Sequence, residues 1–208
     1  MTPTRRPALA RLDVASPPAQ IRVMFDLEQF VADCRAALGD DESHGAIREI
    51  VARAVSEPST VLRALGEPRR AQLQKLHQSR DLTILNVVWA PGMTLLPHDH
   101  RMWAVIGIYT GREDNIFWRR LPGSPGGKVE AVSARALCEG DTAPLGRQII
   151  HSVTNPIPRL TGAIHIYGGD FFGVPRSEWD PETLLEQPSD GERIMRRMEE
   201  ANALYVQR

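Results

Sequence analysis

The spacing of apolar residues along the chain changes once, close to Arg70. Before that point, from Asp26 to about Leu65, apolar residues recur every three or four positions, the spacing of helices with one buried face. The pattern predicts two or three short helices, with breaks near "GDD" and "SEPS". The apolar residues that define the first helix are Leu27, Phe30, Val31, Cys34 and Leu38.

Helix starts in this region are predicted from side chains that accept hydrogen bonds from the backbone N–H groups of a first turn. Asp41 or Ser43 is expected to cap the second helix. Ser56, with Pro58 after it, is expected to cap the third, because proline fits the first turn of a helix.

The segment after Arg70 consists of short runs that favour β-strands, separated by turn residues. Segments 122–127 ("PGSPGG") and 139–146 ("EGDTAPLG") are predicted to be turns. Many short strands with regular turns indicate a mainly β sandwich or barrel, because these architectures remove or protect the unpaired edge strands of antiparallel sheets. The predicted strands span 83–90, 104–111, 114–121, 128–137, 148–155 and 161–169.

These patterns divide the chain into four regions. Residues 1–20 are predicted to be a disordered tail, and residues 21–68 a helical N-terminal segment. Residues 69–178 are predicted to form the barrel. Residues 179–208 are predicted to be a C-terminal extension, in which "SDGERIMRRMEEANALYV" is a charged helix on the outside of the molecule.

Composition narrows the classes of partner. With 208 residues and a formal net charge of −1, the chain has no electrostatic reason to bind nucleic acid or an anionic membrane. Its apolar stretches are shorter than the roughly 20 residues that span a bilayer, and its start does not resemble a secretory signal. Cys34 and Cys138 lie far apart, which favours a reducing cytoplasm over a disulfide framework.

Two of the six histidines, His98 and His100, are separated by one residue. In a strand they point to the same side and Asp99 to the other, so both could hold one metal ion. His151, on a later predicted strand, could supply a third ligand. The alternative is that His98 and His100 are a polar strand end after Pro97.

A second pair, His165 and Tyr167, also shares one face of a predicted strand. This pair could belong to the same site. Alternatively, the histidine could be a core residue with satisfied hydrogen bonds and the tyrosine a buried structural one. His44 and His77 are expected to be ordinary surface or edge residues.

The segment from Gly92 through "HDH" at 98–100 to Gly111 resembles the first cupin motif, and "PLGRQIIHSVTN" resembles the second. Together with "AIHIYGGDFF", these segments are similar to the thiol dioxygenases of the cysteine dioxygenase family, especially its bacterial 3-mercaptopropionate dioxygenase branch. The resemblance covers about Leu82 to Arg176. It implies a cupin double-stranded β-helix, a jelly-roll barrel, preceded by α-helices.

The resemblance implies that His98, His100 and His151 hold a mononuclear non-haem Fe(II). The acidic ligand common in other cupins would fall at Ala104 or Val105, so the site is expected to be neutral. Because three neutral histidine ligands leave both positive charges of Fe(II) uncompensated, the site favours an anionic thiolate. The cysteine that animal cysteine dioxygenases join to the active-site tyrosine is absent, so that tyrosine is expected to be unmodified.

Further roles also come from the resemblance. His165 and Tyr167 match a Ser-x-His-x-Tyr triad, but Ala163 occupies the serine position, so the relay is expected to be truncated to two members. Arg176 matches an arginine that pairs with the substrate carboxylate, a task that suits a bidentate guanidinium. The implied reaction oxidises a small thiol, such as 3-mercaptopropionate or cysteine, to its sulfinate with O2.

Other functions are compatible with the sequence. Imidazole ligands accept zinc, nickel or manganese as well as iron. A cupin with these ligands could act on a small molecule that is not a thiol, or bind a metabolite without catalysis. The sequence specifies neither the thiol nor the oligomeric state.

Overall fold

A computed structural model describes residues 24–39 and 44–206 of the chain. The predicted N-terminal region contains three helices, α1 (Leu27–Ala36), α2 (Gly45–Ser56) and α3 (Pro58–Leu65). The side chain of Asp26 caps α1 by accepting a hydrogen bond of 3.0 Å from the backbone N–H of Gln29. Residues 1–20, predicted to be a tail, lie outside the described residues.

Of the two helix caps that were predicted, one is wrong and the other lies outside the described residues. Ser56 is the last residue of α2 rather than the cap of α3, whose preceding residue is Glu57. Pro58 does occupy the first turn of α3, as expected. The residue before α2 is His44, and Asp41 and Ser43 lie outside the described residues.

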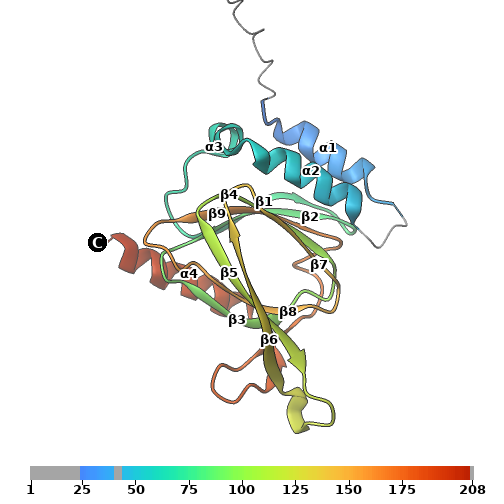
Figure 1. Ribbon diagram of the computed structural model, residues 1–208, viewed down its shortest axis with the longest axis vertical. Coiled ribbons are helices and arrows are strands. Elements are labelled where there is room, and N and C mark those ends of the chain that lie inside the picture. Colours follow the sequence, from blue (N-terminus) through green and yellow to red (C-terminus); the bar gives the residue numbers. More distant parts are fainter. Residues whose placement is uncertain (1–23, 40–43, 207–208) are drawn as a thin grey trace, which may run out of the picture.

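Two antiparallel sheets face each other and form the barrel (Figure 1). The first sheet, in the order β1-β2-β9-β4-β7, lies beneath α1 to α3, and the second has the order β11-β10-β3-β8-β5-β6. The mainly β, jelly-roll prediction with N-terminal helices is therefore confirmed. The strands of the first sheet are β1 (Gln72–Gln78), β2 (Thr83–Trp89), β4 (Ala104–Thr110), β7 (Thr142–Leu145) and β9 (Thr161–Tyr167). Those of the second are β3 (Thr94–Asp99), β5 (Arg112–Arg120), β6 (Val129–Cys138), β8 (Ile150–Thr154), β10 (Ser177–Trp179) and β11 (Glu186–Pro188).

Several strands differ from the prediction. Strand β7 lies in the segment 139–146 that was predicted to be a turn. Strand β7 forms an edge of the first sheet. Proline is tolerated in an edge strand because the backbone N–H that it lacks is not needed on the side without a partner strand. The boundary predicted at 178/179 falls within β10, which pairs with both β3 and β11.

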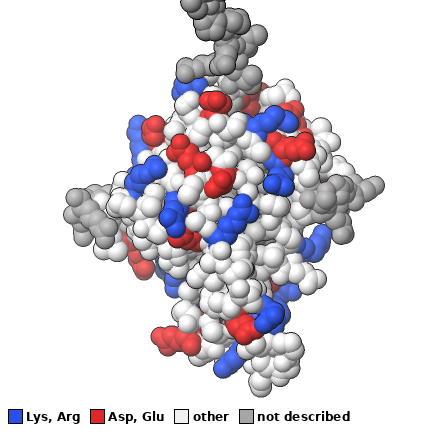
Figure 2. All heavy atoms as spheres, viewed as in Figure 1, with Lys and Arg blue, Asp and Glu red and all other residues white. Residues whose placement is uncertain are grey.

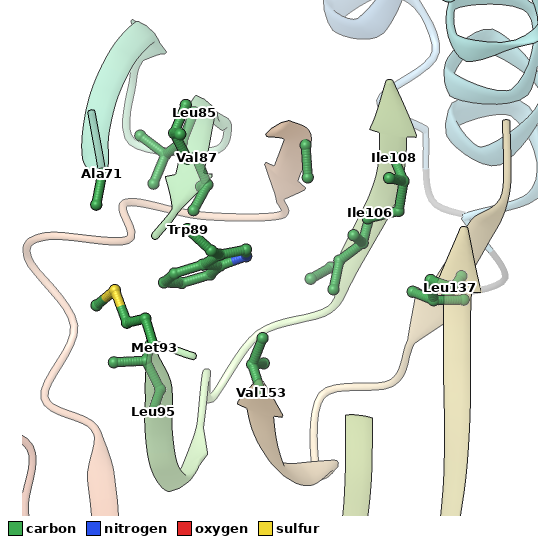
Figure 3. Close-up of a cluster of buried hydrophobic side chains, with 14 of the residues drawn as sticks. Ala71, Leu85, Val87, Trp89, Met93, Leu95, Ile106, Ile108, Leu137 and Val153 are labelled. Atoms are coloured by element: carbon green, nitrogen blue, oxygen red, sulfur yellow. The ribbon is translucent and has the colours of Figure 1, made fainter. Parts of the chain in front are cut away.

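The three central strands of the first sheet, β2, β4 and β9, are buried on both faces, which explains their continuous apolar runs. On β9, Ile164 and Ile166 pack in the cluster beneath the helices, whereas Ala163 and Tyr167 belong to the cluster inside the barrel. Figure 3 shows Trp89 among the side chains of this inner cluster.

The C-terminal helix α4 (Gly191–Val206) is only partly the outer charged helix that was predicted. Met198 is buried in the inner cluster, and Ile194 packs against that cluster. Asn202 is also buried: its amide accepts a hydrogen bond of 2.6 Å from the N–H of Ala71 and donates one of 3.0 Å to the carbonyl of Ala71. The helix is therefore anchored to the start of β1.

The surface carries no large region of one charge on the face shown in Figure 2, where basic and acidic side chains are interspersed. This distribution agrees with the net charge of −1. Among the described helices, none combines the length and apolarity needed to cross a membrane. Cys34 is buried and Cys138 is exposed, and both are free thiols.

Candidate metal centre

Two paired strands of the second sheet bring three histidines together. His98 on β3 lies directly opposite His151 on β8, and His100 follows the last residue of β3. One nitrogen of each ring lies within 4.8 Å of the corresponding nitrogens of the other two. The Nε2 atoms of His100 and His151 are 3.3 Å apart. The structure therefore brings the three predicted residues together.

The three rings are held in the neutral form that binds metals. Burial lowers the pKa of His98 to about 4. Burial, and then the neighbouring histidines, lower the pKa values of His100 and His151 well below the usual value. Three neutral imidazoles in a small volume, two of them buried and His98 half-buried, have the donor set of a metal centre. The residues present therefore fit a divalent ion.

Two acceptors orient the ligand rings. The Nδ1 of His98 lies 2.9 Å from the carbonyl oxygen of Leu96, and the Nδ1 of His151 lies 2.7 Å from the Oδ1 of Asn115. Each Nδ1–H can therefore donate, which leaves the Nε2 lone pair for a metal. Ala104 and Val105, the two positions at which an acidic ligand was considered, are apolar and buried, so neither supplies a carboxylate to the cluster.

Asp99 points away from the cluster, as expected from strand alternation. Its carboxylate forms an ion pair of 2.6 Å with Arg101 and accepts a hydrogen bond of 2.8 Å from the N–H of Ser177. These contacts join the end of β3 to β10. Asp99 therefore contributes to the frame of the site and not to its ligands.

The second predicted pair, His165 and Tyr167, faces the cluster from the first sheet. The Nδ1 of His165 lies 3.0 Å from the hydroxyl of Tyr167, whose ring centroid is 5.0 Å from that of His100. Burial raises the pKa of Tyr167, so its hydroxyl keeps its proton at neutral pH. The pair thus places a hydroxyl beside the candidate metal ligands.

The hydrogen bonds of this pair agree with the expected two-membered relay. Ala163 leaves the serine position without a hydroxyl, and within the described residues the Nε2 of His165 has no hydrogen-bond partner. The Oε2 of Glu113 lies 3.6 Å from that Nε2, which exceeds a hydrogen bond. A buried carboxylate from β5 is therefore a close neighbour of the relay on the side away from Tyr167.

Sequence reasoning did not find Glu113 or Asn115. Glu113 is fully buried and Asn115 is 1% exposed, although both lie in a run of polar residues that suggests a surface strand. Their separation by two residues was the available signal, because it places both on one face of β5. Only the contacts between strands show that this face is the interior.

A cavity of about 500 Å³ is lined by the three clustered histidines and by His165 and Tyr167. Arg176 lines it, and the guanidinium carbon lies 3.7 Å from the centre of the Phe171 ring. Arg176 forms no ion pair within residues 24–39 and 44–206, and burial lowers its pKa. The other lining residues include Leu73, Val87, Trp89, Leu95, His98, His100, His151, Val153, His165 and Tyr167.

Helix α4 also contributes to this cavity, which the sequence did not indicate. Ile194 and Met195 line it, together with Arg196. The expectation that His44 and His77 lie apart from the site agrees with the lining residues, which include neither. His44 instead stacks on Trp103, with ring centroids 4.5 Å apart.

Comparisons with known proteins give a coarse likeness. No family model matches the chain. An RmlC-like cupin family protein with a double-stranded β-helix fold, from Methanocaldococcus jannaschii, is 11% identical with a TM-score of 0.42, over 51% of this chain and 87% of that protein. An oxalate oxidase in complex with glycolate is 18% identical with a TM-score of 0.38, over 50% of this chain and 53% of that one.

A variant of Bacillus subtilis oxalate decarboxylase is 13% identical with a TM-score of 0.39, over 50% of this chain and 26% of the decarboxylase. The match thus spans about half of the oxalate oxidase and about a quarter of the decarboxylase. These structural neighbours are cupin proteins. A likeness at this level says nothing of metal, substrate or reaction, which must be inferred from the side chains of this chain.

Proposed function

We propose that this chain is an iron-dependent thiol dioxygenase that converts a small thiol carboxylate, of the 3-mercaptopropionate or cysteine type, to its sulfinate. The observation that carries the proposal is the presence, in one cavity, of a neutral three-histidine cluster and the guanidinium of Arg176, which forms no ion pair within the described residues. A thiolate needs a cation without competing anionic ligands, and a carboxylate needs a fixed cationic donor. This cavity offers both.

Iron(II) held by His98, His100 and His151 would supply the redox chemistry that activates O2 and a positive charge that favours the thiolate. The overall reaction is balanced: one thiol and one O2 give one sulfinate and one proton. Both oxygen atoms pass to the sulfur, and no organic cofactor is consumed.

The side chains of the protein bind and orient the substrate. Arg176 holds the carboxylate, and its position is fixed by the ring of Phe171 beneath the guanidinium. Tyr167, positioned by His165, donates a hydrogen bond to substrate or oxygen at the cluster. The apolar walls formed by Val87, Leu95 and other residues exclude water from the reacting atoms.

A second candidate is a metal-dependent cupin that acts on a larger carboxylate without a thiol. The observation that favours it is the cavity volume of about 500 Å³, which lies in the range of pockets for drug-sized ligands and exceeds the needs of a three-carbon thiol. The same cluster and Arg176 would bind such a molecule.

The test begins with anaerobic purification, reconstitution with Fe(II) and measurement of O2 uptake over a panel of compounds. The panel contains 3-mercaptopropionate, cysteine, 2-mercaptoethanol, longer mercapto acids and the corresponding hydroxy acids. The proposal predicts uptake with short thiol carboxylates and a sulfinate product. Uptake with hydroxy acids alone would favour the second candidate, and no uptake with any thiol would contradict the proposal.

A further inference from the structure

Glu113 is a fully buried carboxylate that the proposed reaction does not use directly. A charge in this position is costly unless other groups compensate it. Within the described residues no lysine or arginine pairs with Glu113; its partners are Trp89, Asn115 and His165. Burial acts to raise the pKa of Glu113, but contacts with these three residues outweigh it and lower the pKa overall. Glu113 therefore accepts hydrogen bonds from Trp89 and Asn115 and lies close to His165.

The first branch of these contacts leads to the metal cluster. The Oε1 of Glu113 accepts a hydrogen bond of 3.0 Å from the Nδ2 of Asn115. Because a carboxylate only accepts, the amide must turn its NH2 group to Glu113 and its oxygen to His151. That oxygen lies 2.7 Å from the Nδ1 of His151. The proton of His151 is thereby placed on Nδ1, and Nε2 is left for the metal.

The second branch crosses to the other sheet. The Oε2 of Glu113 accepts a hydrogen bond of 2.8 Å from the indole N–H of Trp89 on β2, and lies 3.6 Å from the Nε2 of His165 on β9. An anionic neighbour on that side favours the proton on Nε2. The Nδ1 of His165 then accepts from Tyr167, 3.0 Å away. The tyrosine hydroxyl is held there until a substrate oxygen replaces this acceptor.

We propose that Glu113 is a positioning residue that places the protons of two histidines at once, His151 through Asn115 and His165 directly. It thereby links the affinity of the metal cluster to the orientation of Tyr167. Only the importance of the Tyr167 orientation rests on the proposed function. The effect on metal affinity holds for any divalent ion and any substrate.

The test compares Glu113→Gln with the unaltered full-length protein, with zinc as the probe. Glutamine keeps the shape but loses the charge beside His165, and it has one acceptor oxygen for the two donors Trp89 and Asn115, so its NH2 group faces a donor. Chelator competition should show zinc affinity reduced about 10- to 100-fold, the usual effect of losing an outer contact of a metal ligand. In the zinc-loaded protein, the ring 15N shifts of His165 should move away from the form protonated at Nε2.

Two further variants separate the branches. Asn115→Ala should lower zinc affinity by a similar factor and leave the His165 shifts unchanged, because it breaks the His151 branch alone. Glu130→Gln, on the neighbouring strand β6 and paired with Arg119 at the surface, is the matched control and should change neither measurement. A general loss of packing would instead alter both measurements in both interior variants.

If Glu113→Gln had the same zinc affinity and the same His165 ring 15N shifts as the unaltered protein, the proposal would be overturned. If that variant does not fold, Asn115→Ala decides the metal branch, and unchanged zinc affinity there would also overturn it. Neither measurement needs thiol or O2. A chain that fails to oxidise thiols can therefore still confirm the role of Glu113, and the reverse is also true.

Discussion

The two sheets that enclose the cavity use histidine in different ways. In the second sheet, His98 and His151 have neutral oxygen acceptors at Nδ1, from Leu96 and Asn115. In the first sheet, His165 has a carboxylate near one nitrogen and a tyrosine hydroxyl at the other. Neutral acceptors suit metal ligands, whereas a carboxylate partner suits a histidine that positions another group. Under the proposed function, the second sheet forms the metal-binding wall of the cavity and the first sheet forms the wall that orients the substrate.

The strongest way to break this comparison is to remove a histidine of the metal-binding wall. His151→Ala should reduce the iron content from about one ion per chain to a small fraction, with loss of nearly all turnover. Elemental analysis after anaerobic reconstitution measures the effect. His77→Ala, a change on β1 outside the cavity, is the control and should keep its iron. Full iron content in His151→Ala would remove the residue from the site.

The opposite wall is tested by Tyr167→Phe, which should keep its iron. Turnover should fall roughly 10- to 1000-fold, the range for the loss of one aimed donor. Iron content and kcat, measured on the same preparation, separate this result from that of His151→Ala. Normal turnover would make the tyrosine structural, and a thioether crosslink found by mass spectrometry would also contradict the account.

Arg176 sharpens the comparison because it is assigned to the substrate and not to the metal. Arg176→Ala should raise KM about 10- to 100-fold for 3-mercaptopropionate, which loses a charge-assisted pair. KM for neutral 2-mercaptoethanol should change little. Arg135→Ala, an exposed position on β6, serves as the control. Equal effects of Arg176→Ala on both thiols would leave the carboxylate without an assigned partner.

A smaller effect is expected from pH on the metal-free protein. The pKa of His98 is lowered to about 4, whereas an unfolded histidine has a pKa of about 6.5. Between these values the unfolded chain binds protons that the folded chain does not, so the free energy of unfolding falls as the pH falls. Urea denaturation should show a lower midpoint at pH 5 than at pH 7. His98→Gln should show a smaller difference, and a higher midpoint at pH 5 would refute the assignment.

The sequence predicted the metal-binding wall better than its surroundings. The shared location of His98, His100 and His151 was predicted from strand alternation and from two sequence motifs that occur in order. Both signals are local properties of the chain. Glu113 was not predicted, because its role depends on contacts with Trp89 and His165, which lie 24 and 52 positions away along the chain. No local pattern distinguishes such a buried acid from a surface one.

The fold shows the same division between local and distant information. The helices and the strands β2, β4, β5, β6, β8 and β9 were predicted from the spacing of apolar residues, whereas β1 and β3 were not among the predicted strands. Strands β10 and β11 have three residues each, too few for any pattern. Helix α4 was recognised as a helix, but its contribution to the cavity depends on how it docks, which Met198 and Asn202 determine through contacts with distant strands.

The central claim is that two oxygen atoms pass from O2 to one sulfur in this cavity. The most direct measurement is mass spectrometry of the product formed from 3-mercaptopropionate by the iron-loaded protein under 18O2. The account predicts a sulfinate that carries two 18O atoms. A disulfide, or a product with oxygen from water, would contradict it.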